Sequence, residues 1–196
     1  MCTNQANIFV RWPRSLANQA WLDPFASRMN DVSRTLLRSP RLVDAAKGKW
    51  LGHPVHPALT DLPIGFWTSA MTVDFFGGPT ADSVARRLIG WGNVAAVPTA
   101  VAGLADARER SDDDQRVAVV HASLNVAGLL AYVFSWIARG RGRRRWGVVS
   151  SLVGASLLTA SGHLGGYLVF DSPRTDSSAD GDVAESRREP IARAST

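Results

Sequence analysis

Apolar residues along this chain are concentrated in four blocks, and most charged residues lie between and outside them. The blocks cover about residues 58–78, 88–105, 117–138 and 146–170. Roughly 20 helical residues cross the hydrocarbon layer of a bilayer, so each block is long enough to span it. A helix bundle in water needs a polar stripe on every helix, yet the third and fourth blocks contain no charged residue. The pattern therefore predicts an all-α protein, an integral membrane four-helix bundle.

The segments outside these blocks divide the chain into three regions. Residues 1–49 contain no apolar run long enough to span a membrane, and we interpret them as an N-terminal arm. Within it, residues 31–46 have one apolar side, which predicts either a short helix on the membrane surface or a mobile arm. Residues 50–170 form the transmembrane domain. Residues 171–196 are rich in Ser, Asp and Arg and cannot bury enough apolar surface, so we expect a disordered tail.

Small residues recur inside the blocks. Because they let membrane helices approach closely, a row of them predicts a helix–helix contact. The row in the fourth block consists of Gly147, Ser151, Gly154 and Ser161. Pro98 in the second block predicts a kink. The sequence shows no internal repeat.

The net charge of +5 and the single cysteine narrow the range of functions. A basic chain suggests nucleic-acid binding when its Arg residues lie on a soluble surface, but here most flank the apolar blocks, so we expect no nucleic-acid partner. One cysteine, Cys2, excludes an intrachain disulfide and a Cys-ligated zinc or iron–sulfur site held by this chain alone.

Four crossings would place both termini and the loop at 106–116 on the same side of the membrane. The opposite side receives the Arg-rich segment 139–145, and short loops rich in Lys and Arg stay in the cytoplasm. We therefore expect a multi-pass protein of the inner (plasma) membrane with both termini extracytoplasmic. Three basic residues before the first block favour the opposite orientation; they are Arg41, Lys47 and Lys49.

All four His residues are predicted to lie near the extracytoplasmic face. His53 and His56 come just before the first helix, His121 is near the start of the third, and His163 is near the end of the fourth. In the segment HPVHP, proline restricts the backbone of each His before it and holds the two imidazoles at a fixed separation. Imidazoles from distant segments at one depth suit a binding site.

Two polar stripes are predicted to face the bundle interior, because residues three and four apart share one side of a helix. The stripe on the third helix is His121, Asn125, Gly128, Tyr132 and Ser135. The stripe on the first helix is Asp61, Gly65, Thr68 and Thr72. A carboxylate beside an imidazole can fix its tautomer, so we expect Asp61 to support His56, with Asn125 supporting the same site.

Three interpretations fit these histidines. The first is haem b held by two axial His residues from different helices, with a remaining His or an Arg at its propionates. His121 and His163 are the first choice as axial ligands, followed by His56. The second is a single metal ion bound by three or four of His53, His56, His121 and His163 with Asp61. In the third, the same residues cap and join helix ends by hydrogen bonds.

Three segments resemble a bacterial and archaeal family of small predicted membrane proteins, the domain-of-unknown-function family numbered 2231. They are LGHPVHPALTDLPIGFWTSA at 51–70, HASLN at 121–125 and SGHLGG at 161–166. The resemblance covers about residues 50–170, and its specific part is the HPxHP start followed by Asp-Leu-Pro-Ile-Gly. It implies a four-helix membrane domain whose notable polar positions are His53, His56, Asp61, His121 and His163.

Some relatives in that family are joined to Rieske-type iron–sulfur domains, which implies an electron-transfer setting. Here a partner chain would have to supply the iron–sulfur or other redox centre. We therefore predict a membrane haem-binding electron-transfer protein or the membrane-anchor subunit of a redox complex, embedded in the lipid bilayer. The alternative is a non-redox metal-binding, structural or transporter-like membrane subunit that uses the same His-lined site. Whether the protein is an enzyme stays open.

Overall fold

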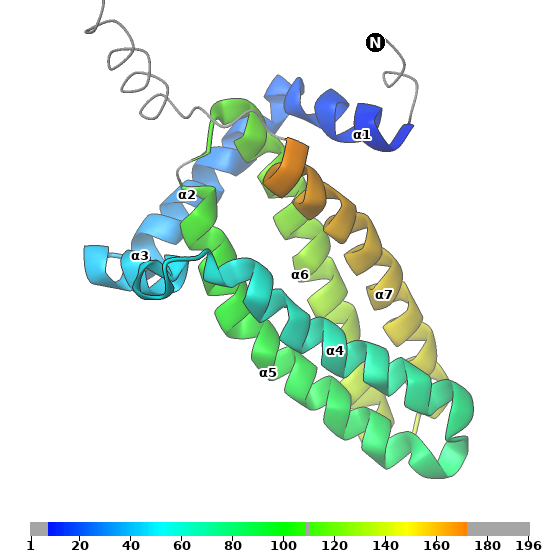
Figure 1. Cartoon of the computed structure of the whole chain (residues 1–196). Helices are drawn as coiled ribbons and strands as arrows, with labels where there is room; N and C mark the ends of the chain where they lie inside the picture. Colours follow the sequence, from blue (N-terminus) through cyan, green and yellow to red (C-terminus); the bar gives the residue numbers. More distant parts are fainter. Residues whose placement is uncertain (1–7, 109, 172–196) are drawn as a thin grey trace, which may run out of the picture.

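The computed structural model describes residues 8–108 and 110–171, and every regular element within them is helical (Figure 1). The predicted tail at 172–196 lies outside the described residues. Three N-terminal helices, α1 (Ile8–Ala17), α2 (Asp23–Leu36) and α3 (Pro40–Lys47), precede four long ones. The long helices are α4 (Val55–Phe76), α5 (Asp82–Ala107), α6 (Asp112–Gly140) and α7 (Arg144–Gly166). Short helical turns are η1 (Ala20–Leu22), η2 (Lys49–Leu51), η3 (Pro79–Ala81) and η4 (Tyr167–Asp171).

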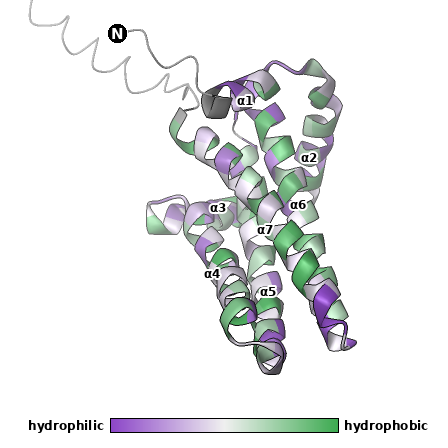
Figure 2. Ribbon diagram, turned by 90° about the vertical axis from the view of Figure 1, so that its right-hand side faces the viewer, coloured by the Kyte–Doolittle hydropathy of each residue, from purple (hydrophilic) through white to green (hydrophobic). Residues whose placement is uncertain are grey.

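The four long helices form two hairpins. α4 packs along α5 and α6 packs along α7, while α5 and α6 join the two pairs (Figures 1 and 2). The turns of both hairpins contain a glycine with a positive φ, Gly78 at 65° and Gly142 at 71°. Glycine adopts this left-handed conformation without the steric cost that a Cβ would add. Pro98 lies inside α5 without ending it.

Among the described residues, three helices are long and apolar enough to cross a membrane: 79–107, 112–140 and 144–170. The predicted first span, now α4, does not meet this condition because Asp61 and Asp74 lower its mean hydropathy. Only 28–33% of the residues in the three apolar windows are buried inside the protein, so most of these windows are accessible from outside. Figure 2 shows hydrophobic residues distributed along the long helices. Such an outward surface suits lipid rather than water.

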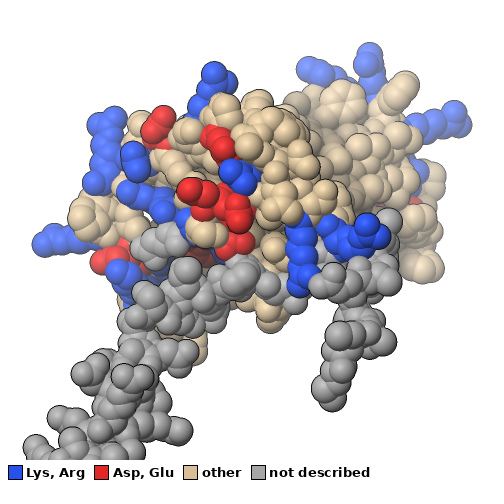
Figure 3. Space-filling model, turned by 90° about the horizontal axis from the view of Figure 1, so that it is seen from above, with Lys and Arg blue, Asp and Glu red and all other residues tan. Residues whose placement is uncertain are grey.

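The N-terminal arm folds onto the end of the bundle where α5 ends and α6 begins. The single helix predicted over residues 31–46 is wrong, because the chain leaves the helix at Leu37 and restarts at Pro40. A residue before proline is pushed out of the α conformation, and Ser39 is extended, with ψ of 133°. Acidic side chains at this end lie among Lys and Arg (Figure 3).

Side-chain hydrogen bonds fasten the arm to the bundle. The hydroxyl of Ser33, on α2, donates to the carbonyl oxygen of Leu104 at 3.0 Å. The guanidinium of Arg116 donates to the carbonyl oxygen of Ala17 at 2.8 Å, and its Nε donates to Oδ1 of Asp23 at 2.6 Å. The described part of the arm is therefore packed against α5 and α6.

The contact between Asp23 and Arg116 should make docking of the arm sensitive to acid. The hydrogen bond from Arg116 holds the pKa of the Asp23 carboxyl below its ordinary value of 3.8. Because the folded-state pKa is the lower one, the contact stabilises the docked arm above pH 3.8 and loses this effect as the pH falls through the folded value. We expect hydrogen exchange of α2 to accelerate over that range in the native protein. The Asp23→Asn variant should lack this acid-induced acceleration. If its pH profile is the same as that of the native protein, the contact between Asp23 and Arg116 is not its cause.

Candidate functional site

His56, in the first turn of α4, is held against α5. Its Nδ1 lies 2.9 Å from the carbonyl oxygen of Thr99, so the ring carries its proton on Nδ1 and donates it there. Gly103 makes this approach possible, since a Cβ at that position would lie 2.9 Å from the imidazole. Pro63 has no N–H and leaves the carbonyl of Leu59 without its helical donor, and the Thr99 hydroxyl donates to that oxygen at 3.1 Å.

His121, on α6, is held against α7 in the same way. Its Nδ1 lies 2.9 Å from the carbonyl oxygen of Ser161, and a Cβ at Gly165 would lie 3.0 Å from the ring. With the proton on Nδ1, the lone pair of Nε2 accepts a hydrogen bond from the Asn125 amide at 3.0 Å. The Ser161 hydroxyl also donates to the His121 carbonyl oxygen at 3.0 Å. Asn125 therefore contacts the His121 imidazole directly.

The likeness of these two contacts extends along both hairpins. On the first helix of each hairpin, His56, Trp67 and Asp74 recur with the same spacing as His121, Tyr132 and Arg139. On the second helix, Gly92, Thr99 and Gly103 recur with the same spacing as Gly154, Ser161 and Gly165. The prediction of no internal repeat is therefore wrong for the structure. The chain contains two equivalent helical hairpins.

Equivalent residues of the two hairpins meet between them. The rings of Trp67 and Tyr132 stack with centroids 4.3 Å apart and planes 3° apart. Nη2 of Arg139 lies 2.5 Å from Oδ2 of Asp74. His56 and His121 each lie 11 residues, about three helical turns, before Trp67 and Tyr132, on the same side of their helices. The equivalent histidines, aromatic residues and charged residues therefore follow one line along the contact between the hairpins.

That line ends in an ionic cluster at the turns of the hairpins, formed by Asp74, Asp82, Arg139 and Arg144. The Arg139 side chain is fully buried and pairs with both carboxylates. Arg144 lies 3.7 Å from an oxygen of each carboxylate. Sequence reasoning missed this cluster because its carboxylates lie on the first hairpin and its arginines on the second. The matched spacing of Asp74 and Arg139 after the two His residues is the signal that could have indicated it.

The remaining predicted ligands lie apart from this line. His163 stacks on Trp12 of α1, with ring centroids 5.8 Å apart, and His53 is exposed in the loop before α4. Asp61 is exposed on α4, and the tautomer of His56 is set by the Thr99 carbonyl oxygen instead. In the part of the chain that the structure describes, no three His, Cys, Asp or Glu side chains are grouped to hold a metal ion.

Only one of the two predicted polar stripes faces inward. On α6, Gly128, Tyr132 and Ser135 are buried and His121 and Asn125 are half-buried, which confirms that stripe. The α4 stripe is wrong, because all its members are exposed and the opposite side, with Pro63, Trp67 and Ala70, packs inside. The predicted small-residue contact is confirmed. Its members Gly147, Ser151, Gly154 and Ser161 are all buried on α7.

Residues 52–174 match the model of a family described as predicted membrane proteins, DUF2231. The chain belongs to the DUF2231 family. The match covers both hairpins and begins after the helices of the N-terminal arm, so the line of equivalent residues lies wholly within the DUF2231 domain. Membership agrees with the three apolar helices and shows a membrane protein. No curated protein and no solved structure matches the chain significantly.

Proposed function

We propose that this protein binds haem b in the membrane and transfers electrons, alone or as the membrane-anchor subunit of a redox complex. His56 and His121, one from each hairpin, would hold the haem iron. One observation carries the proposal: both rings donate Nδ1–H to a backbone carbonyl, which directs the lone pair to Nε2. A neutral imidazole fixed in this tautomer is the form that binds haem iron.

This choice of ligands differs from the order expected from the sequence. His163 was preferred to His56, but it stacks on Trp12 of the arm, outside the line shared by the hairpins. Two neutral imidazoles from different helices are a donor set that haem b takes, and haem would supply one-electron oxidation and reduction there. Binding would require the Asn125 amide to leave Nε2 of His121. The chain's own contribution is to fix both imidazoles through Thr99 and Ser161 and to exclude water with the apolar helix surfaces. A partner subunit carrying an iron–sulfur or other redox centre would exchange the electrons.

The proposal includes four membrane crossings. α4 runs along α5, which is apolar enough to span, and it presents Leu62, Ile64, Phe75 and Phe76 outward. These side chains would face lipid if α4 crosses beside α5. Both termini and the histidines then lie at one membrane face, which we assign to the extracytoplasmic side of the inner membrane because the opposite turns carry the Arg-rich segment.

One observation favours a second candidate, a non-redox structural or transporter-like subunit. The Asn125 amide occupies Nε2 of His121, the nitrogen that iron would need, and His56 and His121 already join their helices by hydrogen bonds. In this case the histidines stabilise the hairpins and need no cofactor. A site for a single metal ion would further require His53 and His163 to regroup with them.

An absorption spectrum of the detergent-purified protein, expressed with ample haem, separates the two candidates. We expect sharp alpha and beta bands after dithionite reduction. His56→Ala and His121→Ala should each abolish the bis-imidazole spectrum, whereas the matched variants His53→Ala and His163→Ala should keep it. Absence of the bands from the native protein, with no metal found in the same sample, would leave the structural candidate.

A further inference from the structure

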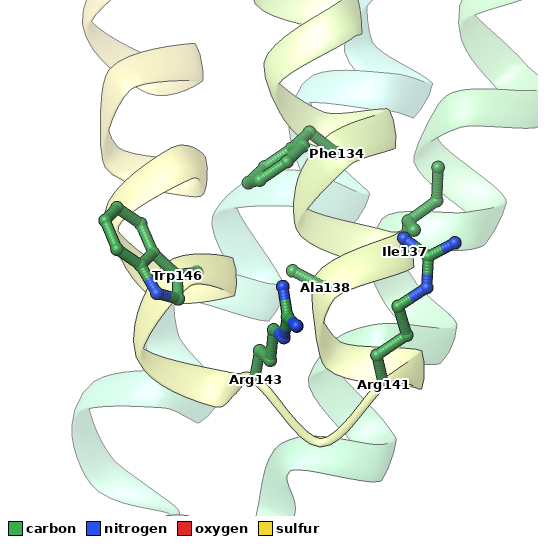
Figure 4. A pocket seen from close by; sticks show the side chains of 6 residues that line it. All are labelled: Phe134, Ile137, Ala138, Arg141, Arg143 and Trp146. Carbon is green, nitrogen blue, oxygen red and sulfur yellow. The ribbon is translucent and has the colours of Figure 1, made fainter.

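A pocket of about 310 Å³ opens at the turn between α6 and α7, at the end of these helices remote from His121. Two arginines and a group of mostly apolar side chains line it (Figure 4). Both arginine side chains extend from the turn back toward the helices. The lining residues are Phe134, Ile137, Ala138, Arg141, Arg143 and Trp146.

The arginines of this turn divide into two kinds. Arg139 and Arg144 are neutralised by Asp74 and Asp82 in the ionic cluster. Arg141 and Arg143 are exposed, and within the described part of the chain neither forms an ion pair or a side-chain hydrogen bond. Among the described residues, their two positive charges thus have no acidic partner, and they border the pocket.

The apolar wall lies on the membrane side of these charges. The turn joins two helices that are each apolar enough to span, so it lies where hydrocarbon gives way to head groups. Phe134 is 53% exposed and Trp146 is 63% exposed, and both belong to those helices. Tryptophan is enriched at this level of the bilayer. A ligand of the whole pocket must therefore combine negative charge with an apolar part.

We propose that this pocket binds one phospholipid with an anionic head group. Its phosphate would be held by Arg141 and Arg143, and the start of an acyl chain would pack against Phe134 and Trp146. Arginine is suited to phosphate because its planar guanidinium donates two parallel hydrogen bonds. Free phosphate would bind the arginines but would make no contact with the apolar wall of the pocket. The proposal does not depend on haem binding, since the site lies at the other end of α6.

Native mass spectrometry of the full-length protein in detergent tests this, with phosphatidylglycerol and phosphatidylcholine titrated separately. A basic side chain near an anionic lipid surface contributes enough to change affinity about fivefold. Arg141→Gln and Arg143→Gln should each weaken phosphatidylglycerol binding by that factor, and the double variant should weaken it about thirtyfold. Arg145→Gln is the matched control, because it removes the same charge from an exposed residue that does not line the pocket.

Three results would overturn the proposal. Equal affinity for phosphatidylcholine would show that head-group charge is not recognised. An equal loss in Arg145→Gln would mean that overall charge, not the pocket, attracts the lipid. Displacement of phosphatidylglycerol by inorganic phosphate at the same concentration would show a site for a free anion. Circular dichroism of each variant confirms that the fold is retained.

Discussion

Replacing Arg139 with methionine is expected to lower the free energy of unfolding by about 3–5 kcal/mol, because it removes one partner of a buried ion pair. The Arg139 side chain is fully buried, and its Nη1 and Nη2 donate to Asp74 at 2.9 and 2.5 Å. It also pairs with Asp82. Methionine keeps most of the side-chain volume. The loss of stability therefore reflects the carboxylates of Asp74 and Asp82, which are left without their positive partner. Arg144 cannot replace Arg139, because it lies 3.7 Å from an oxygen of each carboxylate, which is too far for a normal hydrogen bond.

The measurement is unfolding in mixed micelles followed by circular dichroism. Arg145→Met is the matched control and should change stability by less than about 0.5 kcal/mol, as expected for an exposed residue. Adding Asp74→Asn and Asp82→Asn to Arg139→Met should recover part of the loss, because the buried charges are then removed together. If Arg139→Met unfolds like Arg145→Met, the cluster does not stabilise the contact between the hairpins.

The structure agrees with the sequence where a helix has one clear polar side. On α6, uncharged and apolar surroundings leave a single stripe from His121 to Ser135, and helical spacing alone places it inside. On α4, both sides carry polar or small residues, so the polar pattern does not decide which side faces inward. The size of the side chains decides it. Trp67 stacks on Tyr132 and Pro63 lies inside, which turns Asp61 outward. A contact between distant segments cannot be read from the spacing of one helix.

The repeat of the hairpins was invisible in the sequence for a related reason. Its matched positions are few, and they often differ in residue type, as with Asp74 and Arg139 or Trp67 and Tyr132. The equivalence appears only when their partners are known. It also explains why His56 and His121, rather than His163, share one geometry: each occupies the same place in its own hairpin, opposite a hydroxyl residue and a glycine.

Gly154→Val is expected to lower the free energy of unfolding by about 1–3 kcal/mol, since it forces extra atoms into a close-packed contact. A Cβ at Gly154 would lie 2.9 Å from the Tyr132 ring and 3.2 Å from the carbonyl oxygen of Gly128. Tyr132 cannot withdraw, because its other face stacks on Trp67 at 4.3 Å and it is only 1% exposed. Unfolding in mixed micelles measures the change.

Because the hairpins are equivalent, we expect the same effect at the matching glycine of the first hairpin, Gly92. Gly92 presses on Trp67 from the other side, where a Cβ would lie 2.5 Å from Nε1, so Gly92→Val should destabilise the protein to a similar degree. Gly162→Val on α7 is the matched control, since no atom lies within 4 Å of a Cβ there. If Gly92→Val and Gly162→Val behave alike, the aromatic stack does not hold the two hairpins together. Because the stack lies between the ionic cluster and the two histidines, the Gly92 and Gly154 variants should also weaken any spectrum that depends on both His56 and His121.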